Sequence, residues 1–253
     1  EPDAGSDLAS LRTRAVRDGD EFVIDGHKVW TSYSDVADWC LLLARTDADV
    51  PKHKGLSAFA VPMHQPGVEQ RPLEMINGVT REFGQVLFDG ARVPAENMIG
   101  EPGEGWALAM TIVSHEREPA ELGYVARYSK SVKQLESLVR ADPRRFGADE
   151  ISAVTRAYVE SEMLRLHVRR RLSERLDGLT HGPEGSIDKL LMTAVEQAVG
   201  HAALAVAGAD AVVDGDDTWL KVYLYSRAQS VMGGTAQIQK NIIATRILGL
   251  TSP

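Results

Sequence analysis

Over the first part of the chain, short apolar runs alternate with polar and turn-forming residues, as half-buried β-strands require. The predicted strands cover Leu11–Val16, Phe22–Ile24, Lys28–Thr31, Trp39–Ala44, Ser57–Val61 and Val86–Phe88. Asp25-Gly26 lies between two of these runs and is typical of a two-residue hairpin turn, which needs positive φ. We predict an antiparallel β-domain, barrel-like or sandwich-like, over residues 1–102, in which Trp30 and Ser32 lie on a returning strand.

After Gly103 the apolar residues recur with helical spacing. The predicted helices cover Gly105–Val139, Ala148–Leu176, Ser186–Val213, Trp219–Val231 and Ala236–Leu248. Asp142-Pro143 and Gly182-Pro183 interrupt this pattern where helices of an antiparallel bundle would turn back. We therefore predict an α+β protein whose second domain, residues 103–253, is of the four-helix-bundle type.

Composition limits the possible partners of this 253-residue chain. Its 36 acidic and 28 basic residues give a net charge of -8, which argues against a nucleic-acid partner. A single cysteine, Cys40, excludes an internal disulfide framework and a cysteine-rich metal site, and we expect no metal. The sequence shows neither a secretory signal nor an apolar run that we expect to span a bilayer, so we expect a cytoplasmic protein without a membrane partner.

The paired glycines Gly233 and Gly234 precede Thr235 and the last predicted helix. Glycines permit unusual backbone dihedrals and close approach, and Thr235 is a favourable N-cap whose neighbouring amides could meet phosphate or ribityl oxygens. A turn of this kind suits a flat cofactor. An ordinary helix cap is the alternative, and for this motif alone it is the commoner case.

Three further motifs precede this turn: Glu1-Pro-Asp-Ala-Gly-Ser-Asp7, Gly26-His-Lys-Val-Trp-Thr-Ser32, and a segment from Val86 to Gly100 that is followed by Gly105-Trp106. In this order the four motifs resemble the acyl-CoA dehydrogenase family. The resemblance covers the middle β-domain and the C-terminal helical domain. An all-helical domain precedes them in that family, so we expect one to be missing upstream, either because the sequence is a piece of a longer protein or because the domain is absent.

The resemblance implies an FAD enzyme that dehydrogenates an acyl-CoA thioester to its trans-2-enoyl product. The residues expected at the cofactor are Gly5, Ser6, Trp30, Thr31, Ser32, Thr235, Ala236 and Gln237. The residues expected at the substrate are Ser6, Arg117, Gly233 and Gly234. In the family the main-chain N–H at the position of Gly233 donates to the thioester carbonyl, a contact that does not depend on the side chain.

Many family members carry the catalytic glutamate where this chain has Gly233. A second arrangement in the family places the base on the first long helix of the C-terminal domain, directly before an arginine, and this chain reads His115-Glu-Arg-Glu118 there. Glu116 is therefore the predicted base, because a carboxylate facing an acyl chain loses solvation and gains basicity. A solvated helix residue is the alternative for Glu116, and Glu118 points to another helix face.

The family binds the adenine half of FAD across a subunit interface with an Arg-x-x-Phe-Gly motif and a glutamine before a glycine-rich turn. This chain has Pro143-Arg-Arg-Phe-Gly147 and Leu204-Ala-Val-Ala-Gly-Ala209 instead. Such a loss resembles bacterial, sterol-catabolism-type enzymes built from unlike subunits. We favour a hetero-oligomer with a second acyl-CoA dehydrogenase chain, with a homo-oligomer open.

The resemblance implies an electron-transfer flavoprotein as electron acceptor. The alternatives are a non-catalytic subunit that supports an active partner, and an oxidase or monooxygenase on the same scaffold.

Overall fold

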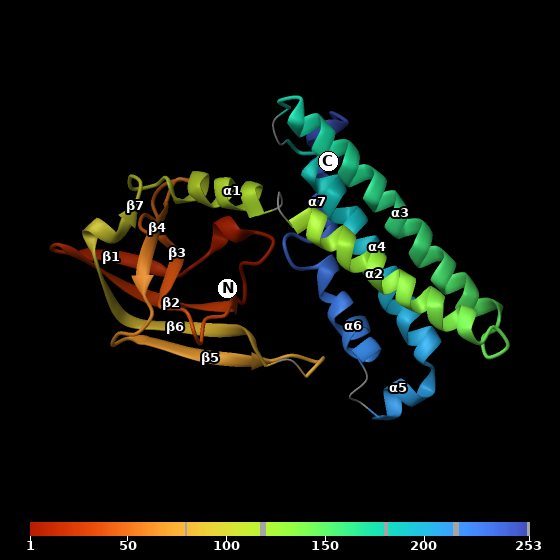
Figure 1. The fold of residues 1–253 in the computed structure, drawn as a ribbon. Helices are drawn as coiled ribbons and strands as arrows, with labels where there is room; N and C mark the ends of the chain where they lie inside the picture. Colours follow the sequence, from red (N-terminus) through yellow and green to blue (C-terminus); the bar gives the residue numbers. More distant parts are fainter. Residues whose placement is uncertain (79, 117–119, 180–181, 215–217, 252–253) are drawn as a thin grey trace. The chain divides into compact units, whose positions relative to one another are not determined.

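The computed structural model describes residues 1–78, 80–116, 120–179, 182–214 and 218–251 (Figure 1). The chain divides into two compact units, Glu1–Val113 and Ser114–Pro253. The first contains a seven-stranded sheet and the second contains helices. This confirms the predicted α+β class, a β-domain followed by a helical one.

The strands of the β unit form one mixed sheet in the order β5-β6-β2-β1-β3-β4-β7. They are β1 (Arg14–Asp18), β2 (Glu21–Ser32), β3 (Trp39–Arg45), β4 (Leu56–Pro62), β5 (Val68–Glu74), β6 (Thr80–Pro94) and β7 (Met98–Ile99), with short 3-10 helices at Leu8–Ser10 and Ala95–Asn97. All neighbouring pairs are antiparallel except β1 and β3, which run parallel. The parallel pair was not part of the prediction.

The predicted hairpin turn at Asp25-Gly26 is wrong, and the turn lies at Gly19-Asp20. The register pairs Asp18 with Glu21, and Gly19 adopts a φ of 63°. The two runs predicted on either side of Asp25-Gly26 are one strand, β2, whose register against β6 shifts between Ile24 and Gly26. A glycine is needed at this bulge for a different reason, because a Cβ on Gly26 would lie 2.6 Å from the Thr13 Cα.

Substitution of Gly26 by alanine is therefore expected to lower the free energy of unfolding by about 2–3 kcal/mol, because the new methyl group overpacks against the backbone beside β1. Chemical denaturation of the purified protein measures this. Gly90→Ala is the matched control, since a Cβ there meets nothing within 4 Å and leaves only the strain of its φ of 66°. Equal losses in the two variants would show that contact with Thr13 is not what requires Gly26.

A core of buried side chains from the sheet and its flanking residues holds the β unit together. Its members are Ala15, Phe22, Ile24, Leu42, Ala44, Phe59, Val61, Met63, Val86, Phe88, Ala91 and Val93. Helix α1 (Gly105–Glu116) begins against this unit, because a Cβ on Gly105 would lie 2.7 Å from the Ser57 carbonyl carbon and Trp106 packs against the cluster that contains Leu56. The β unit thus extends past the last strand into the first turns of α1.

The helical unit is built around α4 (Gly185–Ala207), which packs against α2 (Ala120–Ala141), α3 (Ala148–Leu176), α6 (Thr218–Ser226) and α7 (Ala236–Ile242). A short α5 (Ala209–Asp214), a 3-10 turn at Ala228–Ser230 and a π-helical turn at Ile243–Ile247 complete it. Helix α3 has the predicted bounds. The helix predicted over Ser186–Val213 instead ends at Ala207, and Gly208, with a φ of 73°, caps α4 before α5 begins.

Helix α4 is long and apolar enough, by length and composition alone, to cross a membrane, contrary to our expectation that no such run exists. Its place in the bundle explains its composition. The helix contributes Val195, Val199 and Ala202 to the core and also buries the charged residues Asp188 and Glu196. The apolar character of α4 is therefore weak evidence for a membrane span.

Candidate active site

The first motif is anchored by Glu1, whose side chain is only 7% exposed. Its carboxylate accepts hydrogen bonds from the Arg12 N–H (2.6 Å), the Thr13 N–H (3.0 Å) and the Lys28 Nζ (2.7 Å). Burial disfavours the charged form, but the hydrogen bonds from Arg12, Lys28 and Thr13 and the charge of Lys28 outweigh it and lower the pKa of Glu1 to about 2. Lys28 also donates to the Leu43 carbonyl at 2.8 Å. Glu1 thus fixes the segment before Gly5 and Ser6 to the sheet.

Gly5 and Ser6 follow this anchor and are exposed, and a Cβ on Gly5 would meet nothing within 4 Å. Asp7 next to them accepts hydrogen bonds from Lys52 Nζ (2.7 Å) and from Ser10 Oγ (2.5 Å). The segment therefore presents its backbone and the Ser6 hydroxyl to the outside of the β unit, where a ligand can reach them.

Trp30 lies in a bulge of β2 with a φ of 63°. The pairing of β2 with β6 is interrupted between Val29 and Thr31, so Trp30 is the extra residue. The indole is 63% exposed and makes one edge-to-face contact, with Phe83 at 6.0 Å. A left-handed conformation is costly for a bulky residue, and such strain gathers at functional sites. The structure thus holds a large flat ring outward at a conformational cost.

Backbone strain is concentrated at this end of β2. Among the described residues, the non-glycine residues with positive φ are Trp30, Tyr33 (52°) and Arg81 (72°). Tyr33 donates its N–H to the Glu82 carbonyl at 2.9 Å, and Ser32 pairs with Phe83, so all three lie where β2 meets the start of β6. Thr31 and Ser32, with Ser32 exposed, follow Trp30 on the same strand. The strand therefore brings three of the predicted cofactor residues together.

The helical unit carries the second group of predicted residues on one turn. Gly233 and Gly234 adopt φ values of 61° and 92°, and the Thr235 hydroxyl accepts the Ile238 N–H at 3.2 Å. The predicted N-cap is thereby confirmed. A Cβ on Gly233 would lie 3.5 Å from Lys189 Cε, which is ordinary contact, so its dihedral rather than crowding favours glycine there.

Sequence reasoning missed Gln239, whose amide organises this turn. The side chain is 0% exposed, and its Nε2 donates to the carbonyls of Gly233 (3.2 Å) and Gly234 (3.4 Å). The sequence gives one indication of this role. Gln239 is polar, yet the helical pattern of α7 places it on the face that packs against the core.

The structure does not describe the side chains of two predicted site residues, Glu116 and Arg117. Helix α1 ends at Glu116, but side chains from 114 to 121 are not described, and Arg117 lies wholly outside the described residues. Their roles as base and substrate contact stay predictions.

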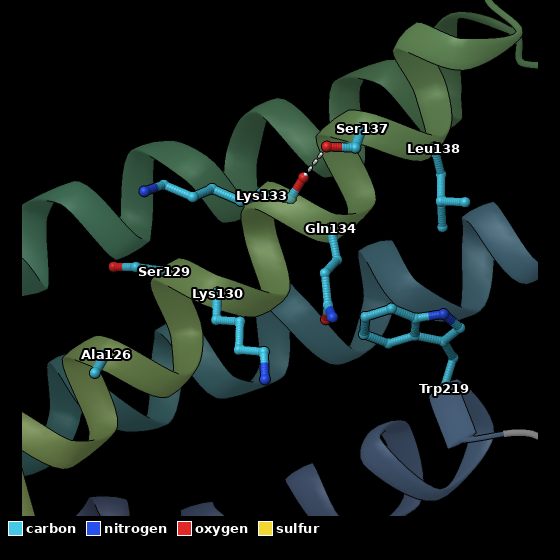
Figure 2. A pocket seen from close by; sticks show the side chains of 8 residues that line it. All are labelled: Ala126, Ser129, Lys130, Lys133, Gln134, Ser137, Leu138 and Trp219. Carbon is cyan, nitrogen blue, oxygen red and sulfur yellow. Dashed lines mark hydrogen bonds between the residues drawn. The ribbon is translucent and has the colours of Figure 1, made fainter.

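The structure also contains a pocket of about 770 Å³ on the surface of α2. Figure 2 shows Gln134 and Leu138 beside Trp219, whereas Ser129 and Lys133 point toward the other side of the helix. None of the predicted site residues lines this pocket. The described residues contain no group of three or more His, Cys, Asp or Glu side chains that could hold a metal ion.

Comparisons with known proteins agree with the two-part organisation. Residues 1–91 match the model of the acyl-CoA dehydrogenase middle domain, and residues 103–248 match that of the acyl-CoA dehydrogenase C-terminal domain. Two relatives from Mycobacterium tuberculosis, acyl-CoA dehydrogenases IpdE1 and FadE34, are 39% and 36% identical over 99% of this chain. The chain spans 65% of the first protein and 34% of the second.

Solved structures show the same similarity. The "Tcur3481-Tcur3483 steroid ACAD" is 28% identical with a TM-score of 0.83 over 100% of this chain and 67% of its own. The ChsE4-ChsE5 complex from Mycobacterium tuberculosis is 27% identical with a TM-score of 0.83 over 100% and 68%. A glutaryl-coenzyme A dehydrogenase bound to glutaryl-CoA is 26% identical with a TM-score of 0.87 over 99% and 65%. The chain therefore belongs to the acyl-CoA dehydrogenase family.

Proposed function

We propose that this chain is the catalytic chain of an FAD-dependent enzyme that converts an acyl-CoA thioester to a trans-2-enoyl-CoA. The observation that carries the proposal is Trp30, an exposed indole held in a left-handed bulge two residues before the exposed Ser32. A planar cofactor explains why this conformation is kept, since an outward-facing ring offers a surface for stacking. FAD, when bound, would supply the hydride acceptor.

The chain's own residues supply the remaining roles in this proposal. Trp30, Thr31 and Ser32 would hold the isoalloxazine of FAD, while Gly5, Ser6, Thr235, Ala236 and Gln237 would hold its ribityl and phosphate portion. Ser6, Arg117 and Gly234 border the thioester and pantetheine, and the Gly233 N–H donates to the thioester carbonyl. The exposed Gly5-Ser6 segment and the ordered Gly233–Gly234 turn support these assignments.

Glu116 is the proposed base. Its carboxylate takes the α-proton of the substrate. FAD, when bound, would accept the hydride from the β-carbon, so that the substrate loses two hydrogens and gains a double bond. Donors at the thioester carbonyl stabilise the charge that develops on oxygen. An electron-transfer flavoprotein is the proposed acceptor for the electrons.

Helix α3 supports a partner subunit because it has two apolar faces. Residues advance by about 100° per position along an α-helix, so these faces lie on opposite sides of α3. The inner face holds Val154, Ala157, Leu164 and Val168, which are buried. The outer side holds Val159, Met163 and Leu166, and the exposed Ile151 and Tyr158 lie along the border between the two sides.

We propose that a second, unlike acyl-CoA dehydrogenase chain pairs with this one. The two-protein names of the similar Tcur3481-Tcur3483 and ChsE4-ChsE5 structures support this pairing. The altered adenine clamp at residues 143–147 and 204–209 supports it as well. The Tcur3481-Tcur3483 protein is named as a steroid enzyme, which supports a sterol-derived acyl group as the substrate of this chain.

The test uses the full-length protein co-expressed with the acyl-CoA dehydrogenase gene beside its own. We expect the two chains to co-purify with fewer flavins than chains, and the flavin absorbance to bleach when acyl-CoA is added without oxygen. A stable complex without flavin or bleaching would favour the non-catalytic subunit that Gly233 also suggests. Rapid reoxidation of the bleached flavin by air would favour an oxidase. One FAD per chain in a lone homo-oligomer would contradict the mixed assembly.

A further inference from the structure

We infer that Gln239 is a positioning residue, which sets the direction of the main-chain N–H groups in the Gly233–Gly234 turn. The inference rests on the proposed function, in which this turn meets the thioester. Nothing in the motif itself assigns a role to this glutamine. Its amide donates to the carbonyls of the turn and, within the described part of the chain, to no other predicted site residue.

The Gln239 amide holds two carbonyls of the turn. Its Nε2 carries two protons and reaches the Gly233 oxygen at 3.2 Å and the Gly234 oxygen at 3.4 Å. A trans peptide is planar, so the N–H of the next residue points opposite to each carbonyl. Fixing these oxygens therefore sets the direction of the Gly234 and Thr235 N–H groups. By holding the Gly233 carbonyl it also restricts the rotation of Gly233, whose own N–H is the proposed donor to the thioester.

The hydrogen bonds from Gln239 are needed because few other interactions fix the conformation of the Gly233–Gly234 turn. Gly233 and Gly234 have positive φ and no side chains, so each could adopt several other conformations in the absence of a contact. Among the described residues, no hydrogen bond has the Gly233, Gly234 or Thr235 N–H as its donor. The turn thus exposes a run of backbone donors of the kind that binds a developing oxyanion.

The amide of Gln239 is buried at the cost of its hydration. The side chain is fully buried, and its Oε1 has no hydrogen-bond partner in the described structure. An unpaired buried acceptor is unfavourable, so an apolar side chain would suit the site better if packing were its only role. The fit is also close, since a Cβ on Gly234 would lie 2.5 Å from Gln239 Nε2.

The test measures the acidity that the site gives to a substrate analogue. A 3-thiaacyl-CoA cannot be dehydrogenated, but its α-carbon ionises and gives a long-wavelength absorbance against bound flavin. In the Gln239→Met holoenzyme the fraction of bound analogue that is ionised at neutral pH is expected to fall about tenfold. This is less than the roughly 10²-fold or larger effect of losing an oxyanion donor, because the N–H groups remain and only their direction changes. Flavin content and thermal unfolding are measured in parallel.

Gln134→Met is the matched control, since Gln134 is an exposed glutamine on α2 away from the turn. Gly234→Ala is the second variant, because its methyl group displaces the amide of Gln239 from the other side and is expected to reduce ionisation by a similar factor. The effects of Gly234→Ala and Gln239→Met are expected to be less than additive, since each removes the same contact.

The outcomes separate this inference from the proposed function. If the unaltered enzyme binds the analogue and does not ionise it, the proposed dehydrogenation is wrong. If the unaltered enzyme ionises the analogue and the Gln239→Met and Gly234→Ala enzymes do so equally well, the dehydrogenation stands and Gln239 does not position the turn.

Discussion

Substitution of Glu116 by glutamine is expected to slow the anaerobic bleaching of bound flavin by acyl-CoA about 10³-fold, within the range that a positioned general base contributes. Glutamine keeps the size of the side chain but cannot accept the α-proton. The donors at the thioester carbonyl remain, so the variant should still bind acyl-CoA and retain flavin. Rapid-mixing absorbance measurements separate the rate of bleaching from the affinity for the substrate.

Glu118→Gln is the control, because it removes the same charge from a glutamate only two positions further along the chain. If Glu116→Gln bleaches as fast as the unaltered enzyme, the base is another group and the assignment of Glu116 is wrong.

The periodic segments of this fold could be predicted from the sequence, because local patterns determine them. Helix α3 was predicted with its bounds, since apolar residues recur at helical spacing along most of it and Glu150 accepts a hydrogen bond from the Gly147 N–H at its start. Strand β5 was missed because it is an edge strand with few apolar residues and a proline, Pro72.

The candidate site was predicted only in part, because its geometry depends on contacts between distant segments. The Thr235 cap follows from a local motif. The bulge that gives Trp30 its positive φ depends on the register of β2 against β6, and the anchoring of Glu1 depends on Lys28. The clamp formed by Gln239 depends on a side chain that folds back onto the turn before its own helix. Sequence patterns name such residues but do not show what they contact.

The Glu1–Lys28 pair should be the largest single electrostatic contribution to the β unit. We expect Glu1→Gln to lower the free energy of unfolding at pH 7 by about 3 kcal/mol, because it leaves the mostly buried Lys28 ammonium without its partner charge. The exposed pair Arg71–Glu69 provides the control, since Glu69→Gln should cost less than about 1 kcal/mol. Denaturant titrations of the three proteins make the comparison.

The dependence of the free energy of unfolding on pH tests the same pair, because the pKa of Glu1 fixes the direction in which stability changes. The folded pKa of Glu1 is about 2, below its ordinary value of 4.5, so its contribution is complete above about pH 4.5 and is lost as the pH falls toward 2. Burial lowers the pKa of Lys28, and Glu1 partly offsets this. Without Glu1, the folded protein should release the Lys28 proton more readily, so the deficit of Glu1→Gln should shrink at alkaline pH.

A double variant separates charge pairing from independent effects of the two groups. Glu1→Gln combined with Lys28→Met removes both charges, so the loss should be smaller than that of Glu1→Gln alone, because no unpaired ammonium remains in the interior. Lys28→Met is also measured alone. If the loss in the double variant instead equals the sum of the losses in Glu1→Gln and Lys28→Met, the two groups act independently. The anchoring of the Gly5-Ser6 segment would then come from the hydrogen bonds of Glu1 to the Arg12 and Thr13 amides, not from its charge pair with Lys28.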